Sequence, residues 1–336
     1  MRFFTAISRS LAAALACAVA QPVLAADQNS GIPAWLQAHV GEGDGQIAAP
    51  VLTKARALYL QKVREGKVHN SCYFAMDATR PNTAAGRFYI ICEGEQQFRV
   101  IASGHGSGRN LPGAANFQND RTCARNFGNA ADSDLTAGGA YVTSEQKTSF
   151  KGYYRAPKNH VAMLSRTFVQ FEGEGETANA RQRAIGGHAA VTLKGVCMRK
   201  APGDSHANKD GLVPFGNLVD YAGGRSNGCT SWSQPDASMI MGMVKSAPTT
   251  LYIYPDSSVV KSVEQAVQSG RSPGQAGLYW NASCLKAIGK PHYWSKDILE
   301  PLIVKYWHDH PGPPPKPTPM CTGEDATPIR KDIVSR

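Results

Sequence analysis

The sequence lacks several features that would place it in common protein classes. Beyond its first residues, no stretch reaches the ~18 apolar residues that a membrane-spanning helix needs, and there is no internal repeat. Charged residues make up only 18% of the 336 residues, and the lysines and arginines behind the +10 formal charge are scattered. No stripe of alternating aromatic and basic side chains indicates nucleic-acid binding, so the positive charge better suits an anionic polymer or surface of the cell envelope.

The first residues have the pattern of a secretory signal. Arg2 and Arg9 precede an apolar run over residues 11–20, and small residues follow up to Ala25. This pattern predicts a signal peptide over residues 1–25 and a soluble, exported mature protein, which in a bacterium would be periplasmic. Hydrophobic residues form 42% of the chain, which is typical of a globular protein.

The cysteines bear on both stability and chemistry. Of eight cysteines, Cys17 falls in the predicted signal peptide, which leaves an odd number in a compartment that oxidises thiols. At least one should therefore be free. If the other six pair, fifteen connectivities are possible. Cys284 with Cys321 is the favoured pair, because both lie in the C-terminal part and would staple it.

The hydrophobic pattern predicts a mainly β protein with a few helices, an α+β fold. Residues 26–69 read as a lead-in and a helix, with apolar side chains at helical spacing from Leu52 to Val63. Strands are expected at 87–92 and 97–102, joined as a hairpin, at 160–173, and at 249–255. A helix should start near Ser233.

Two further segments have biased composition. Residues 103–150 are mostly Gly, Asn, Asp, Ser and Thr, which predicts a long loop-rich and functional stretch. Residues 256–336 form a C-terminal extension that ends in the proline-rich "HPGPPPKPTPM", expected to be extended and semi-rigid.

The segment "GGRSNGCTSWS", residues 223–233, surrounds Cys229 with small and polar residues. Gly228 allows a strained turn or a close approach of the substrate and leaves the sulfur unshielded. Successive backbone N–H groups there could face a developing oxyanion. Cys229 is therefore a candidate nucleophile, against the simpler alternative of a disulfide.

A cysteine nucleophile needs a base, because an unperturbed thiol titrates near ~8.5. His188 in "RAIGGHAAVTL" follows two glycines and opens an apolar strand, which makes it the best candidate. His105 in "SGHGSG" is a second histidine that could line the same cleft. For His188 the alternative is a structural role at a strand end. His308 and His310 have a spacing seen in metal sites, but two ligands are too few for a closed zinc site, so no metal is expected.

The segment "GRSNGC" resembles the Ser-X-Gly-Cys signature of the YkuD-type L,D-transpeptidases, particularly the murein L,D-transpeptidase catalytic domain subgroup. "SGHGSG", "FGNAADSDLTAGGAYVTSE", "FKGYY" and "ETANARQRAIGGHAAV" occur in the order expected for that subgroup. The resemblance covers residues 70–255 and implies a YkuD-like β-sandwich or barrel. Residues 26–69 and 256–336 are then N- and C-terminal extensions.

The resemblance implies a role for each matching residue. Cys229 would be the acyl-accepting nucleophile and His188 its proton partner. Gly228, Ser226 and Arg225 would shape the loop and the oxyanion pocket, together with Asn227. Many family members have a histidine at the position of Asn227 and an arginine at that of Ser231. The second departure removes a cation that could hold a substrate carboxylate.

The function implied is a transferase of cell wall biogenesis that cross-links peptidoglycan stem peptides through a cysteine thioester, without a cofactor. Donor and acceptor stems would be its partners, and carbapenems would acylate Cys229. One alternative is a cysteine peptidase or amidase that hydrolyses wall peptides, and another is a non-catalytic wall-binding protein. The sequence does not select the linkage, 3-3, 1-3 or another.

Overall fold

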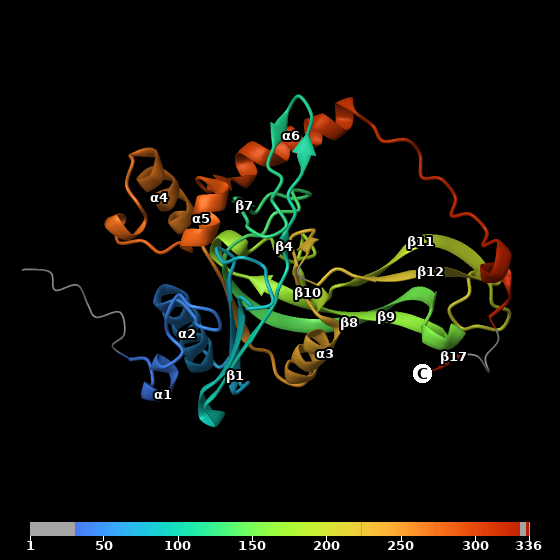
Figure 1. Cartoon of the computed structure of the whole chain (residues 1–336), viewed down its shortest axis with the longest axis horizontal. Helices are drawn as coiled ribbons and strands as arrows, with labels where there is room; N and C mark the ends of the chain where they lie inside the picture. The colour runs from blue at the N-terminus through green and yellow to red at the C-terminus, as the bar shows by residue number, and fades with distance from the viewer. Residues whose placement is uncertain (1–30, 223, 330–333, 336) are drawn as a thin grey trace, which may run out of the picture.

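The computed structural model describes residues 31–222, 224–329 and 334–335 of the chain (Figure 1). The predicted signal peptide lies outside these residues. The described residues form a mixed α/β structure, which confirms the α+β class in its coarse form. Within the described ranges, no helix has the length and apolar character needed to cross a membrane.

Strands outnumber helices. The α-helices are α1 (Ala34–Gln37), α2 (Ala49–Arg64), α3 (Gln234–Met243), α4 (Ser257–Gln268), α5 (Ala282–Ile288) and α6 (Lys296–Asp309). The strands are β1 (Cys72–Asp77), β2 (Phe88–Cys92), β3 (Gln97–Ile101), β4 (His105–Gly106), β5 (Asn110–Leu111), β6 (Ala115–Asn116), β7 (Asn126–Gly128), β8 (Gly139–Arg155), β9 (Val161–Gly173), β10 (Gly186–Ala189), β11 (Val191–Lys200), β12 (Leu212–Asp220), β13 (Arg225–Ser226), β14 (Thr230–Trp232), β15 (Thr250–Tyr254), β16 (His292–Trp294) and β17 (Val334–Ser335).

One large sheet organises the molecule. Its strands run in the order β14-β10-β9-β8-β15-β1-β2-β3, while β12 joins β8 and pairs with β11. Strands β1 and β15 are buried on both faces, and their sequences are apolar apart from Asp77 and Thr250 at their ends. On one face Tyr73 and Tyr252 pack with α2, and on the other Phe74 and Leu251 join the main core around Trp232.

The local sequence explains the two helices that flank this sheet. Pro50 lies in the first turn of α2, and Val51, Leu52, Ala55 and Leu58 form its buried face. The helix α3 begins where it was expected, because the Ser233 hydroxyl accepts a hydrogen bond from the backbone N–H of Asp236.

The hairpin of β2 and β3 and the strands β9 and β15 confirm the corresponding predictions. The expectation of a loop-rich stretch over residues 103–150 is wrong for its last part. Residues 139–155 form the long strand β8, which pairs with β9 along most of its length. Its middle part, residues 145–151, is largely exposed, so polar side chains suit this strand and hide it from a composition-based prediction.

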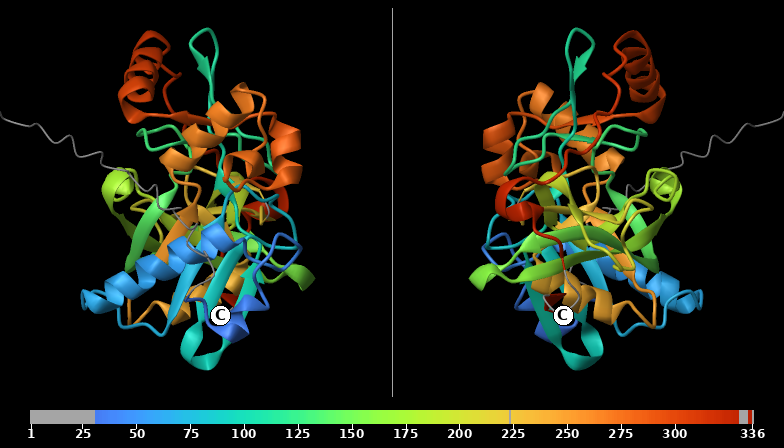
Figure 2. Two further views of the ribbon diagram at one scale, coloured as in Figure 1. Left: turned by 90° about the vertical axis from the view of Figure 1, so that its left-hand side faces the viewer. Right: turned by 90° about the vertical axis from the view of Figure 1, so that its right-hand side faces the viewer.

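The C-terminal residues pack on the loops that follow β4. Strand β16 pairs with β7, and Leu299 and Ile303 of α6 share a buried cluster with Leu111 and Phe117. Figure 2 shows α6 and the β5–β6 hairpin side by side at one end of the molecule. After α6, residues 311–319 run without regular structure and fully exposed to the far tip of β11 and β12 (Figure 1).

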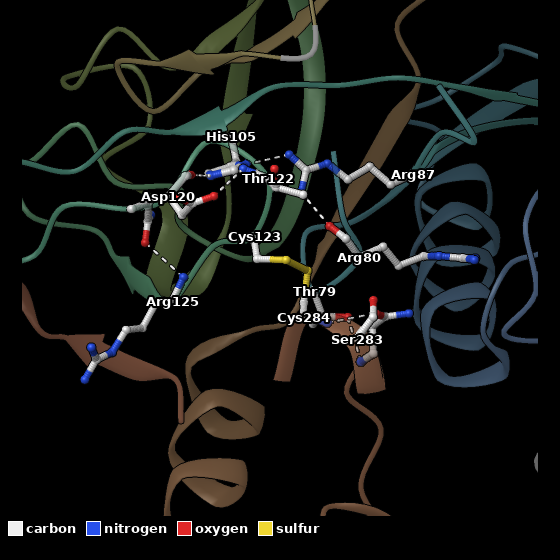
Figure 3. Close-up of a disulfide and its surroundings, with 12 residues drawn as sticks. Thr79, Arg80, Arg87, His105, Asp120, Thr122, Cys123, Arg125, Ser283 and Cys284 are labelled. Atoms are coloured by element: carbon white, nitrogen blue, oxygen red, sulfur yellow. Dashed lines mark hydrogen bonds between the residues drawn. A yellow bond between two sulfur atoms is a disulfide. The ribbon is translucent and has the colours of Figure 1, made fainter. Parts of the chain in front are cut away.

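Three disulfides use six of the seven cysteines that the structure describes. They join Cys72 to Cys92, Cys123 to Cys284 and Cys197 to Cys321. The expected Cys284–Cys321 pair is wrong. Each of these cysteines instead ties the C-terminal part to an earlier strand or loop. Cys284 of α5 is bonded to Cys123 (Figure 3). Cys321 follows the proline-rich segment and is bonded to Cys197 of β11.

Candidate functional site

Cys229 lies between β13 and β14 and is the single free cysteine among the described residues, as the odd count requires. It is half-buried. Its thiol donates to the carbonyl oxygen of Ala184, 3.5 Å from Sγ. A sulfur that is unbridged in a chain with three disulfides is available for chemistry of its own.

The turn before the cysteine requires glycine. Gly228 has φ = +98°, a conformation that L side chains rarely adopt. A Cβ there would lie 2.9 Å from the carbonyl oxygen of Leu135 and 3.0 Å from Cδ1 of Ile185. The buried Ser226 closes the turn, because its hydroxyl donates to the carbonyl oxygen of Cys229 at 2.5 Å. The loop that presents the sulfur is thus fixed at both ends.

His188 is carried by the strand next to the one that follows Cys229. Strands β10 and β14 are parallel, with Gly187 opposite Thr230 and His188 opposite Ser231. Cys229 directly precedes β14, so this pairing brings His188 and Cys229 to the same region of the sheet. On the other side of His188, Phe168 of β9 stacks on the imidazole with ring centroids 6.4 Å apart.

A backbone contact sets the tautomer of His188. Its Nδ1 lies 2.9 Å from the carbonyl oxygen of Ala189. A carbonyl oxygen only accepts, so Nδ1 carries the proton and Nε2 is the basic nitrogen of the neutral ring. Burial lowers the pKa of His188 to about 4, and the charges of Arg166 and Lys151 add to this effect. The imidazole is therefore neutral at pH 7.

The thiol is neutral at this pH as well. Burial raises the pKa of Cys229, although a backbone hydrogen bond with Gly186 and the charges of Arg166 and Arg183 act in the opposite direction. The resting site thus holds a neutral thiol and a neutral imidazole in one cavity, and the proton must leave the sulfur as the bond to the substrate forms.

Cys229 and His188 open into one cavity of about 510 Å³. Three more of the residues predicted from the sequence line it, namely Arg225, Ser226 and the exposed Asn227. The guanidinium of Arg225 is tied to the loop after β6, since Nη1 donates to the carbonyl oxygen of Asn119 at 2.5 Å. Gly228 does not line the cavity, but its backbone conformation sets the loop that carries Cys229.

His105 does not line this cavity. It is fully buried, and its Nδ1 lies 2.6 Å from Nη2 of Arg87 while Nε2 lies 2.9 Å from the carbonyl oxygen of Asp120 (Figure 3). Burial and the neighbouring Arg87 hold the pKa of His105 well below its usual value. Both ring nitrogens hold the loop after β4 to the core. His105 therefore has a structural role, and the expectation that it lines the cleft is wrong.

Five lining residues were missed by the sequence analysis: Arg166, Phe168, Ala184, Thr192 and Tyr221. Arg166 and Phe168 alternate on β9, so the strand predicted at 160–173 contained the signal that they share a face. Their position beside His188 depends on the pairing of β9 with β10, which the sequence does not specify. In the described part of the chain, no three His, Cys, Asp or Glu side chains gather as a metal site would require.

The chain was compared with models of protein families, with curated proteins and with solved structures. None of these matches it.

Proposed function

We propose that this protein is an enzyme of the bacterial cell envelope, an L,D-transpeptidase that cross-links peptidoglycan stem peptides through an acyl-enzyme on Cys229. The observation that carries the proposal is that the free thiol and the Nδ1-protonated imidazole of His188 share one cavity on neighbouring strands. The likeness of "GRSNGC" and its flanking segments to the transpeptidase signature supplies the substrate class.

In the first half-reaction the thiol attacks an amide carbonyl of the donor stem. The Sγ–H proton passes to Nε2 of His188 as the sulfur–carbon bond forms. The carbonyl oxygen becomes an oxyanion, and backbone N–H groups at Gly228 and Cys229 would stabilise it. When the C–N bond breaks, Nε2–H gives its proton to the leaving amine, and a thioester remains on Cys229.

The second half-reaction reverses these roles. An amine of the acceptor stem attacks the thioester carbonyl and passes its proton to the neutral Nε2. The carbon–sulfur bond breaks, the sulfur takes the proton back, and the cross-linked stems leave. The contact of Nδ1–H with the carbonyl oxygen of Ala189 stabilises the imidazolium that exists between the two proton transfers.

Product analysis tests the proposal. The mature protein is incubated with disaccharide-tripeptide and disaccharide-tetrapeptide stems, separately and together, with Cys229→Ala as the matched control. Dimers that form with the wild type and are missing with the variant are the expected result, and their fragmentation identifies the linkage. Equal product patterns for both proteins would overturn the proposal.

The same incubation separates the hydrolytic alternative. If water takes the place of the acceptor amine, the wild type yields shortened monomers and no dimer even when acceptor stems are in excess. That result would reassign the site to a cysteine peptidase or amidase with the same two residues.

A further inference from the structure

The wall of the Cys229 cavity carries positive charge without matching negative charge. Arg166 and Arg225 are among its lining residues, and no aspartate or glutamate is. Arg225 is tied to the carbonyl oxygen of Asn119 and so belongs to the loop scaffold. Arg166 has no comparable anchor, which makes it the cation of the cavity that is free to meet a ligand.

The contacts of Arg166 are weak for a half-buried guanidinium. Its Nη1 lies 3.5 Å from both the carbonyl oxygen of Val191 and the hydroxyl of Tyr221, at the outer limit of a hydrogen bond. Among the described residues it forms no ion pair with a carboxylate. Lys151 is a second basic group close to Arg166: burial and then the charge of Arg166 lower the pKa of Lys151. A partly desolvated cation in this setting favours an anionic partner.

The pairing of the strands places Arg166 relative to the thiol. Phe168 of β9 is opposite His188, and Arg166 precedes Phe168 by two residues on the same face. Cys229 precedes Thr230, the partner of Gly187, on the far side of His188. Along the strand direction the two levels are four residues apart, on the order of 13 Å, and β10 lies between β9 and β14. After burial, the charge of Arg166 also acts on the pKa of both Cys229 and His188 and lowers each, so its guanidinium is near enough to both residues to bind an acidic group of a molecule held at the thiol.

From this arrangement we infer that Arg166 is the carboxylate anchor of the cavity and binds an acidic group of the donor stem near the scissile amide. Naming that group as the second carboxylate of the stem's diamino acid rests on the proposed function. The anion preference of the cavity does not. Many members of the resembled family have an arginine where this chain has Ser231. Arg166 on β9 would supply the cation that is missing at that position. It is a specificity residue, and His188 and Cys229 remain the reacting groups.

Alkylation of Cys229 measures the anion preference without any wall substrate. Rates are taken by intact mass for bromoacetyl-glycine, a carboxylate, and for bromoacetyl-glycinamide, its neutral match, each divided by the rate with free cysteine. A charge-assisted contact predicts that the wild type favours the carboxylate by about tenfold or more. In Arg166→Gln this ratio should fall to near one.

Arg271→Gln is the matched control, because it removes the same charge from an exposed arginine after α4. It should keep the wild-type ratio. Equal ratios in the wild type and in Arg166→Gln would overturn the inference, and so would an equal loss in Arg271→Gln. Matching circular dichroism and thermal melts of the three proteins exclude a folding defect.

Thioester formation then identifies the anion. Donor stems whose diamino acid has a free or an amidated side-chain carboxylate are compared with no acceptor present. In the wild type, the free acid should reach half-maximal acylation at an about tenfold lower concentration than the amide, with a similar limiting rate. In Arg166→Gln the two stems should behave alike. If the wild type and Arg166→Gln form the thioester with the same ratio of half-saturating concentrations for the two stems, the inference fails while the proposed function stands. If no stem acylates the wild type, the proposed function fails and the alkylation ratio still decides the anion site.

Discussion

The Nδ1 atom of His188 lies 2.9 Å from the carbonyl oxygen of Ala189, the next residue along β10. The backbone of β10 therefore both carries the imidazole and sets its tautomer. The partner of Nδ1 is a carbonyl oxygen and not an acidic side chain. Because burial keeps the ring neutral at pH 7, His188 is suited to accept a proton from the thiol during attack, and a preformed ion pair is disfavoured.

The first prediction concerns the reactivity of the thiol toward a small neutral reagent. Burial raises the pKa of Cys229, so the thiolate fraction grows as pH rises and is small at pH 7. Alkylation by iodoacetamide should therefore accelerate up to and beyond pH 9 without a plateau near neutrality, and His188→Gln should leave this profile nearly unchanged. A plateau below pH 7 that His188→Gln abolishes would reveal an ion pair.

The second prediction concerns acylation by the substrate, where His188 must accept the proton. Loss of a general base typically costs ~10²–10⁴ in rate, so His188→Gln should slow thioester formation by that factor while Cys229 stays alkylatable. Because the pKa of His188 is lowered to about 4, the neutral base persists as pH falls to about 5 and is lost below that. Stopped reactions across pH 3.5–8 measure this, and a midpoint near ~6.5, the ordinary histidine value, would contradict it.

The third prediction concerns Gly228. Gly228→Ala adds a Cβ within 3.0 Å of two neighbouring atoms at a positive φ, so the loop must shift. We expect a loss of ~1–3 kcal/mol in the free energy of unfolding and a loss of acylation. Gly203 also has a positive φ, +78°, but nothing lies within 4 Å of an added Cβ there. Gly203→Ala should share the backbone cost and retain activity, and equal acylation by both variants would refute the role of the turn.

The fourth prediction concerns the disulfide between Cys197 and Cys321, which are 124 residues apart. A cross-link restricts the unfolded chain more when its loop is longer, so replacing both cysteines by serine should cost roughly 2–5 kcal/mol of stability. The Cys72–Cys92 pair closes only 20 residues and should cost less. Urea unfolding of the two double variants compares them, and the opposite order would exclude loop closure as the main contribution.

The sequence predicted those features of the fold that depend on local pattern. The hairpin of β2 and β3, the strand β15 and the helix capped by Ser233 each carry their own periodicity or capping residue. Strand β8 was missed, because its exposed middle part is rich in polar residues. The disulfides of Cys284 and Cys321 were missed because their partners are set by how distant segments pack.

The candidate site follows the same division. Cys229, Gly228 and Ser226 lie in one short motif, so the sequence alone places them together. His188 was the predicted base because it follows two glycines and opens an apolar strand. The pairing of β10 with β14, which brings it to the cavity of Cys229, was not predictable. Arg166 reaches the cavity only through the β9–β10 pairing, and His105 leaves it because Arg87 and the Asp120 carbonyl engage its ring.

The most direct test of the account is the intact mass of the protein after mixing with a disaccharide-tetrapeptide stem and rapid quenching in acid. We predict that the wild type gains the mass of the stem without its leaving C-terminal residue, on Cys229, and that hydroxylamine removes this thioester. Cys229→Ala should show no adduct. An unmodified wild type, or an equal adduct on the variant, would contradict the claim that Cys229 is the acyl-accepting nucleophile.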